Sequence, residues 1–125
     1  MQDKVLQLLE LKDNWDEEGA KAPTENTVWR AYYLAKNIEC VKRQKIHAVV
    51  PGPNGEILIW LKKDDKDLEI IFYPDKKKTV VVRASNSEKA SQDEFKIKDL
   101  KTYLKWLNNS RTFTEEKPDE TWGLN

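Results

Sequence analysis

The sequence is poor in the residues that most often build covalent links and metal sites. It contains one cysteine, Cys40, and one histidine, His47, among 125 residues. A single cysteine excludes an internal disulfide and a zinc site made of cysteines alone. A zinc site needs three or four ligands, and the chain has no further cysteine or histidine to complete one. We therefore expect no metal and no cofactor, and we interpret His47 as a residue of an edge strand.

The chain also lacks an excess of charge of either sign. Its 22 lysines and arginines balance its 22 aspartates and glutamates. A general nucleic-acid binder usually carries a basic excess or a basic stripe, so this balance argues against nucleic acid as a partner. The lysines at 76–78 lie in a predicted turn, where a run of charge is typically solvated.

Long hydrophobic runs are absent as well. None approaches the length of a transmembrane helix, and the N-terminal segment carries charges at Asp3, Lys4 and Glu10, where a signal peptide has an apolar core. We expect a cytoplasmic protein that does not associate with a membrane. With 38% hydrophobic residues among 125, the chain is apolar enough to form the core of one compact domain.

Apolar residues recur at helical spacing in several segments. Val5, Leu8 and Leu9 predict an amphipathic helix over residues 2–12. Thr24 is a typical N-cap residue and predicts a second helix over residues 24–41. A third helix is expected to begin at Ile97 and to end near residues 108–109, because apolar positions again follow three- and four-residue steps.

Between these segments the apolar residues alternate, which is typical of strands. Four such runs, separated by short turn-rich segments, lie at residues 45–51, 56–61, 68–73 and 79–83. Loops this short join antiparallel neighbours, because parallel strands need a crossover of a dozen or more residues. The sequence thus predicts an α+β fold with two N-terminal helices, a four-stranded antiparallel meander, a polar loop at 84–94 and a C-terminal helix. Residues 1–109 form the single domain, and residues 110–125 form a tail that docks on it or extends from it.

Both faces of the predicted meander are apolar. Ile59 and Phe72 share one face, whereas Trp60 and Tyr73 have the opposite parity. An antiparallel sheet with one wet face would alternate apolar and polar residues, so something covers the second face. We leave three alternatives open: the chain's own helices or tail, a protein partner such as a second copy, or a ligand cleft. If all helices pack on the Ile59 face, Trp60 and Tyr73 remain for a two-fold symmetric dimer.

Five tryptophans and four tyrosines are many for a chain of this length. Trp29 and Tyr33 lie beside the apolar stripe of the second predicted helix, and Trp106 lies beside that of the third. Helices of small domains often tolerate aromatic residues in such positions. Aromatic residues are also enriched as interface anchors, so these three are candidate binding residues.

The segment DNWDEEGAKAP, residues 13–23, is the stretch that most resembles a site. A calcium loop needs ligands at alternating positions and a central glycine, a pattern that Trp15 and Gly19 break. An acid pair of Asp13 and Asp16 would need contrasting environments across a cleft. We favour a structural corner in which Asp16 bonds backbone amides, Gly19 takes a positive φ, and Trp15 is mostly buried against the first or second helix. A binding role for Trp15 and Asp16 is the alternative.

Two short motifs carry a resemblance to a group of known proteins. They are the NWD and GA of residues 14–20, and GEILIW at residues 55–60. Through these motifs residues 1–83 resemble short bacterial and phage-associated proteins that have an NWDxxGA start and a GxIxxW strand. The resemblance implies an α+β domain and no established activity.

These features favour a non-enzymatic protein that acts by binding a macromolecular partner and that forms a homodimer. An antitoxin, an immunity protein or a phage-encoded inhibitor of host defence suits the size and the charge. The alternatives are a protein that binds or sequesters a small, nucleotide-like ligand in a cleft between protomers, and an enzyme of unknown class. No catalytic residue is predicted, because the sequence shows no phosphate loop and no nucleophile–base pair. The predicted binding residues are Trp60, Tyr73, Trp15, Asp16, Trp29, Tyr33 and Trp106.

Overall fold

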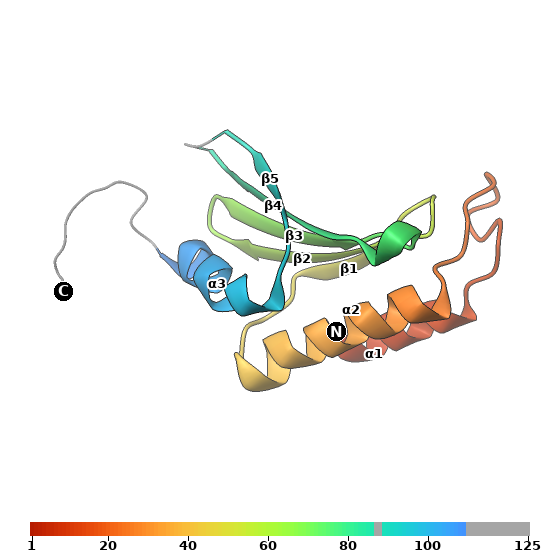
Figure 1. The fold of residues 1–125 in the computed structure, drawn as a ribbon, viewed down its shortest axis with the longest axis horizontal. Coiled ribbons are helices and arrows are strands. Elements are labelled where there is room, and N and C mark those ends of the chain that lie inside the picture. Colours follow the sequence, from red (N-terminus) through yellow and green to blue (C-terminus); the bar gives the residue numbers. More distant parts are fainter. Residues whose placement is uncertain (87–88, 110–125) are drawn as a thin grey trace, which may run out of the picture.

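Five antiparallel strands form one sheet in which the spatial order is the order of the chain (Figure 1). The computed structural model describes residues 1–86 and 89–109. Each strand pairs with its neighbour in the chain, which is the topology of a meander. The strands are β1 (Ala48–Pro51), β2 (Ile57–Lys63), β3 (Lys66–Phe72), β4 (Thr79–Ser85) and β5 (Ser91–Glu94).

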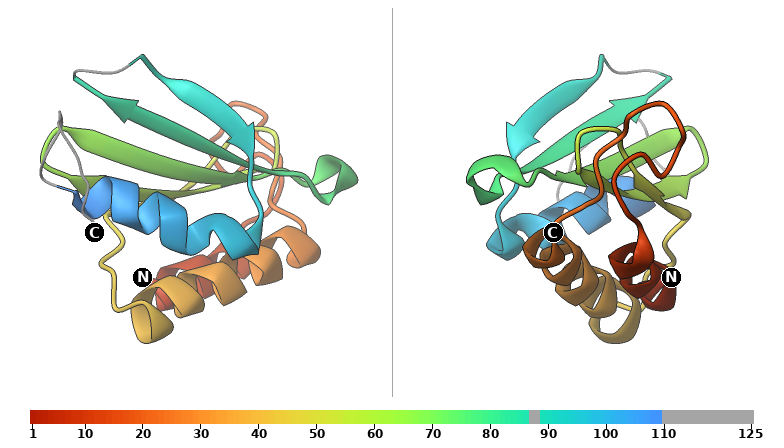
Figure 2. Two further views of the ribbon diagram at one scale, coloured as in Figure 1. Left: turned by 60° about the vertical axis from the view of Figure 1, so that its left-hand side comes forward. Right: turned by 90° about the vertical axis from the view of Figure 1, so that its right-hand side faces the viewer.

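Three α-helices, together with the short turns that extend them, lie on one face of this sheet (Figure 2). α2 and α3 pack against β2 and β3, and α1 packs beside α2. Within residues 1–86 and 89–109 the helices pack on one face of the sheet only, so the alternative that the chain's own helices cover the second face is wrong for these residues. The helical segments are α1 (Gln2–Gln7) with a 3₁₀ turn (Leu8–Glu10), α2 (Glu25–Lys36) with a π-helical turn (Asn37–Val41), and a 3₁₀ turn (Ile97–Asp99) leading into α3 (Leu100–Asn108).

The strand register explains why the helix side of the sheet is buried. Ile59 of β2 pairs with Ile70 of β3, which pairs with Val81 of β4, so these side chains form one row on that face. Each of the three is at most 1% exposed. The core that they share with the helices comprises Val5, Val28, Ala31, Leu34, Ala35, Ile38, Ile46, Ile57, Ile59, Leu61, Leu68, Ile70, Phe72, Val81, Leu100, Leu104 and Leu107.

The second helix begins where the sequence predicts it. Thr24 is the N-cap residue, and its Oγ1 accepts a hydrogen bond from the backbone N–H of Thr27 at 3.2 Å. Glu25 lies in the first turn, where a negative charge favours the positive end of the helix dipole. The predicted cap is therefore confirmed.

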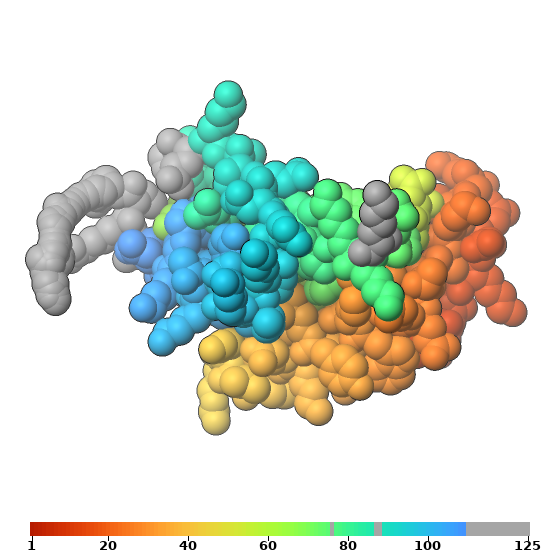
Figure 3. Space-filling view, in the orientation of Figure 1, coloured from red at the N-terminus to blue at the C-terminus, as the bar shows by residue number. Residues whose placement is uncertain are grey.

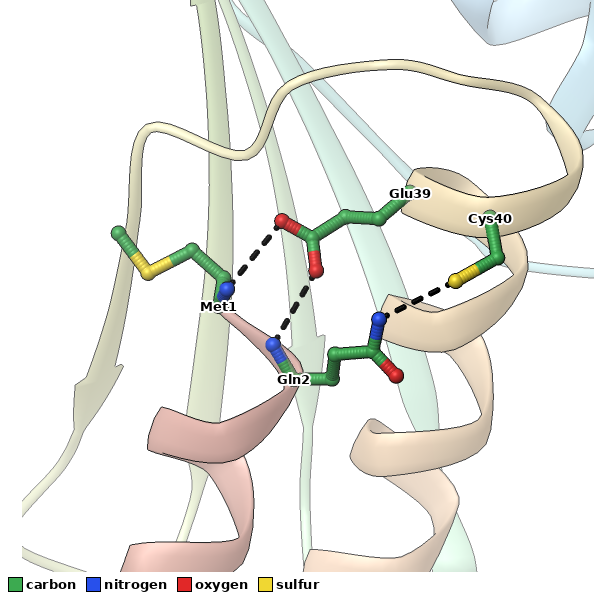
Figure 4. Close-up of polar contacts among 4 residues, drawn as sticks. All are labelled: Met1, Gln2, Glu39 and Cys40. Carbon is green, nitrogen blue, oxygen red and sulfur yellow. Dashed lines mark hydrogen bonds and ion pairs between the residues drawn. The ribbon is translucent and has the colours of Figure 1, made fainter.

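The start of α1 is tied to the end of the α2 segment (Figure 4). Glu39, in the π-helical turn, accepts the backbone N–H of Gln2 on Oε1 at 3.1 Å and the amino group of Met1 on Oε2 at 3.3 Å. The side-chain amide of Gln2 also donates to Sγ of Cys40 at 3.2 Å. The first N–H groups of a helix have no partner within the helix, so Glu39 satisfies one of them from another element.

The predicted α+β fold with an antiparallel sheet is confirmed, but the predicted number of strands is wrong. β5 lies in the segment 84–94, for which the sequence predicts a loop. The residues of β5 are serine, glutamine, aspartate and glutamate, so they show no apolar alternation. β5 is an edge strand that pairs with β4, and this pairing rather than side-chain burial supports its conformation.

The first predicted helix is shorter than expected, because the helical segment ends at Glu10. No helix in the described part of the chain is long and apolar enough to cross a membrane. The predicted tail, residues 110–125, lies outside the described residues.

Candidate functional site

The face of the sheet opposite the helices, which we call the open face, carries two mainly apolar cross-strand rows. Helices of the described chain do not cover this face (Figures 1 and 2). Val50 is 41% exposed, Val80 is 2% exposed, and the other members on β1 to β4 are half-buried. The rows are Val50, Leu58, Ile71 and Val80, and next to them Ala48, Trp60, Glu69 and Val82, and they continue onto β5 with the polar residues Glu94 and Gln92.

Trp60 is held in the middle of the open face by polar and ring contacts. Its indole N–H donates to Oδ1 of Asp67 at 2.8 Å, and the ring of His47 lies edge-on with ring centres 4.5 Å apart. The ammonium group of Lys62 lies 5.8 Å from the Trp60 ring centre. These contacts already fix the Trp60 ring, and its N–H already has an acceptor, so the side chain loses little conformational freedom when a partner binds. Side chains that anchor interfaces share this property.

Tyr73, the second predicted anchor, lies just beyond the end of β3 and is half-buried. Its backbone N–H donates to the carbonyl of Lys78 at 2.8 Å. Its own carbonyl accepts a hydrogen bond from Nη2 of Arg30 at 2.5 Å. The backbone of Tyr73 therefore connects one end of the sheet to α2.

The segment between α1 and α2 is a corner closed by its own side chains. Oδ1 of Asp16 accepts the backbone N–H groups of Glu18 at 2.9 Å and Ala20 at 3.0 Å, so the predicted role of Asp16 is confirmed. Oδ1 of Asn14 accepts the N–H of Gly19 at 2.7 Å. Gly19 has the predicted positive φ, at +87°.

Trp15 connects the same corner to the residues just before α2. Its indole N–H donates to the carbonyl of Lys21 at 3.1 Å, and the backbone N–H of Lys21 donates to the carbonyl of Pro53 at 2.8 Å. These bonds fasten the corner to the turn between β1 and β2. Trp15 is half-buried and lies outside the core cluster, and its packing against α1 or α2 stays a prediction.

Two acids of the corner, Asp13 and Asp16, accept backbone N–H groups. Hydrogen bonds from the N–H groups of Glu18 and Ala20 hold the pKa of the Asp16 carboxyl below its ordinary value. The general acid of a glycosidase-like pair needs the opposite, a raised pKa. Asp13 likewise accepts the N–H of Ala22 at 3.0 Å. Within residues 1–86 and 89–109, no three histidine, cysteine, aspartate or glutamate side chains gather in a group that could hold a metal.

The remaining predicted aromatic residues lie in the helical layer. Trp29 and Tyr33 meet on α2 with ring centres 5.9 Å apart, and they are 37% and 64% exposed. Trp106 of α3 is half-buried and packs against the core cluster. Trp60 belongs to the opposite face of the sheet, so the structure does not bring the predicted binding residues together in one site.

A pocket of about 420 Å³ lies between α2 and the link from β5 to α3. Figure 3 shows the side of the molecule on which α2 (orange), the segment after β3 (green) and the link from β5 to α3 (teal) meet. Of its lining residues only Tyr33 was predicted as a binding residue, because the pocket forms only where α2 meets Phe72, Thr79, Phe95 and Ile97 from distant parts of the chain. The lining residues that were not predicted are Arg30, Leu34, Asn37, Phe72, Thr79, Phe95 and Ile97. The one local signal was an arginine, Arg30, beside the apolar stripe of α2.

Comparison with protein-family models, with curated proteins and with solved structures gives no match in any of the three. The resemblance of residues 14–20 and 55–60 to bacterial and phage-associated proteins stays a prediction.

Proposed function

We propose that this chain is a non-enzymatic interaction protein that binds protein through its open face, in the simplest case a second copy of itself. The observation that carries the proposal is the mainly apolar second face of the sheet, which no helix of residues 1–86 and 89–109 covers. Antitoxins, immunity proteins and phage-encoded inhibitors of host defence are the classes that this proposal covers.

The size of the open face suits the centre of an interface. Two rows across four strands, at about 4.8 Å per strand, make a patch on the order of 300 Å². Contiguous patches of roughly this size are often functional on monomers. A standard interface takes about 800 Å² from each partner, so the flanking strand residues and turns would have to supply the rest.

The charges on the open face suit contact between two copies. Glu69 lies within the second row, and Lys62 has the same strand parity as Trp60, so both signs occur on this face. Away from a two-fold axis, residue i of one copy contacts residue j of the other and j contacts i, so an off-axis Glu69 can face a lysine of the partner instead of its own equivalent. Pairs of opposite charge at the rim add specificity to an apolar centre.

The oligomeric state tests this proposal. We expect light scattering at micromolar concentration to give the mass of a dimer for the unchanged protein. Leu58→Asp places a charge in the first apolar row and should give a folded monomer, because an unpaired charge in an apolar interface is strongly unfavourable. Leu9→Asp is the matched control, since Leu9 is an exposed residue of the helical layer, 42% exposed.

The control variant should remain a dimer with the same far-UV circular dichroism as the unchanged protein. A monomeric mass for the unchanged, folded protein would reject the dimer. Equal loss of association in Leu58→Asp and Leu9→Asp would show that the open face is not the contact surface.

A further inference from the structure

We propose that the pocket between α2 and the β5–α3 link binds a small apolar carboxylic acid, with its carboxylate on Arg30 and its apolar body inside the pocket. This site lies on the helix side of the sheet and is independent of the open face. The proposal therefore does not rest on the dimer, and either one can fail without the other.

The walls of the pocket are suited to an apolar ligand. Leu34 and Phe72 are 6% and 3% exposed and belong to the core cluster, and Phe95 packs against that cluster. At the rim, Ile97 and Tyr33 are 61% and 64% exposed, so large apolar side chains border the opening. A volume of about 420 Å³ falls within the usual range of small-ligand sites.

Arg30 gives the pocket a positive charge that no acid balances. Its Nε donates to Asn26 at 3.1 Å, and its Nη1 donates to the Thr79 hydroxyl at 3.2 Å. Its Nη2 donates to the carbonyl of Tyr73. A guanidinium carries five N–H donors, so two remain. Among the described residues, Arg30 forms no ion pair with a carboxylate.

The surroundings of Arg30 favour an anionic ligand. The guanidinium carbon lies 5.9 Å from the ring centre of Phe72, and burial lowers the pKa of Arg30 from its ordinary value. The group nevertheless stays charged in proteins, because its reference pKa is so high. A partly buried cation whose present partners are neutral gains a charge-assisted hydrogen bond when a carboxylate binds it.

Asn37 also lines the pocket, one turn of α2 beyond Tyr33. Its Oδ1 is buried without a hydrogen-bond partner in the described structure, and it begins the π-helical turn Asn37–Val41. Single π-helical turns within α-helices are frequent at functional sites. Asn37 follows Arg30 by about two helical turns, or about 10 Å along the axis at 1.5 Å per residue. The Oδ1 atom of Asn37 has almost no accessible surface, so the groups that hold a ligand here are the Arg30 guanidinium and the apolar walls.

Indole-3-propionate is the probe, because it has an apolar ring, one ring N–H group and a carboxylate. Its primary amide is the matched neutral probe of the same shape. We expect the acid to bind about tenfold more tightly than the amide in calorimetry, because only the acid forms a charged pair with Arg30. Backbone amide shifts in nuclear magnetic resonance should be largest between residues 30 and 37 and between residues 95 and 97.

Variants at the rim separate charge from folding, since Arg30 itself also holds Tyr73 and Thr79 in place. Ile97→Glu adds a negative charge at the opening and removes an apolar contact, so it should weaken the acid about fivefold more than it weakens the amide. Leu9→Glu, an equivalent change at another exposed residue of the helical layer, should change neither.

Three outcomes would overturn the proposal. They are equal affinity for the acid and its amide, absence of binding by either, and equal weakening by Leu9→Glu and Ile97→Glu. Shifts concentrated outside the two segments would overturn the assignment of the ligand to this pocket.

Discussion

Single side chains decide the conformation of the corner between α1 and α2. Asn14 and Glu17 have positive φ angles of 69° and 64°, which side chains other than glycine rarely adopt. The carboxylate of Asp16 and the amide of Asn14 hold this conformation by accepting backbone N–H groups. Asp13 and Asp16 are therefore explained by backbone donors that a tight corner leaves without a partner, whereas the carboxylates of Glu17 and Glu18 accept no such bond among the described residues.

The charge of Asp16 should make this corner sensitive to pH. Its pKa in the folded state lies below the reference value of 3.8, so the charge stabilises the fold above about pH 3.8. This contribution is lost as the pH falls through the lowered pKa, where the folded state also becomes protonated. The stability difference between the unchanged protein and Asp16→Asn, measured by urea unfolding, should therefore shrink over that interval.

Glu17→Gln is the matched control, because it removes one charge from the same corner. The structure gives the Glu17 carboxylate no hydrogen bond to another described residue. Its stability difference should change little over the same pH interval. If both variants changed the pH profile equally, net charge rather than the hydrogen bonds of Asp16 would be responsible.

At the scale of the element, Lys66 joins the start of β3 to the end of α3. Lys66 is 5% exposed, and its ammonium group donates to the carbonyls of Trp106 and Asn109, both at 2.8 Å. The last carbonyls of a helix have no partner within the helix, and a cation there also suits the helix dipole. The strand therefore provides a cap for the helix that packs on it.

Lys66→Met tests this cap. The methionine keeps most of the apolar stem but removes the donor, so we expect a loss of about 1–3 kcal/mol in the free energy of unfolding. Lys62→Met is the control, because Lys62 forms an exposed ion pair with Asp67 at 3.5 Å. That change should cost less than about 1 kcal/mol. Equal losses in urea unfolding would mean that the cap contributes nothing beyond a surface pair.

At the scale of the whole molecule, the two faces of the sheet differ in what covers them. Ile59 on the helix side is 0% exposed, whereas Ile71 on the open face is only half-buried. Ile59→Ala should reduce stability by about 2–5 kcal/mol, because it leaves a cavity in the core. Ile71→Ala should cost less in dilute solution, since less of its surface is removed from water within one chain.

The same pair of variants reports on association. If a second copy covers the open face, the thermal midpoint of the unchanged protein should rise with protein concentration, and Ile71→Ala should reduce this rise. Ile59→Ala should lower the midpoint by a similar amount at every concentration. A midpoint that does not depend on concentration would contradict the dimer.

Local patterns in the sequence determined the type of most elements. Alternation identified β2, β3 and β4 and placed Trp60 opposite Ile59, because side-chain direction in a strand follows from backbone geometry alone. The cap at Thr24 and the bonds of Asp16 were also predictable, since each joins residues close in the chain. β5 was not predictable, because its polar residues carry no alternation and its pairing with β4 supports it.

Tertiary structure alone decided which face the helices cover and which residues share the pocket. The alternation along β2 places Trp60 and Ile59 on opposite faces of the sheet. It does not determine which of the two faces the helices cover, because that depends on packing between distant segments. Arg30, Phe72 and Ile97 meet in the pocket although they lie far apart in the chain. Arg30 looks like an ordinary helix-surface residue in the sequence. Its missing counter-charge is visible only after folding, because desolvation and ion pairing depend on the neighbours that the fold supplies.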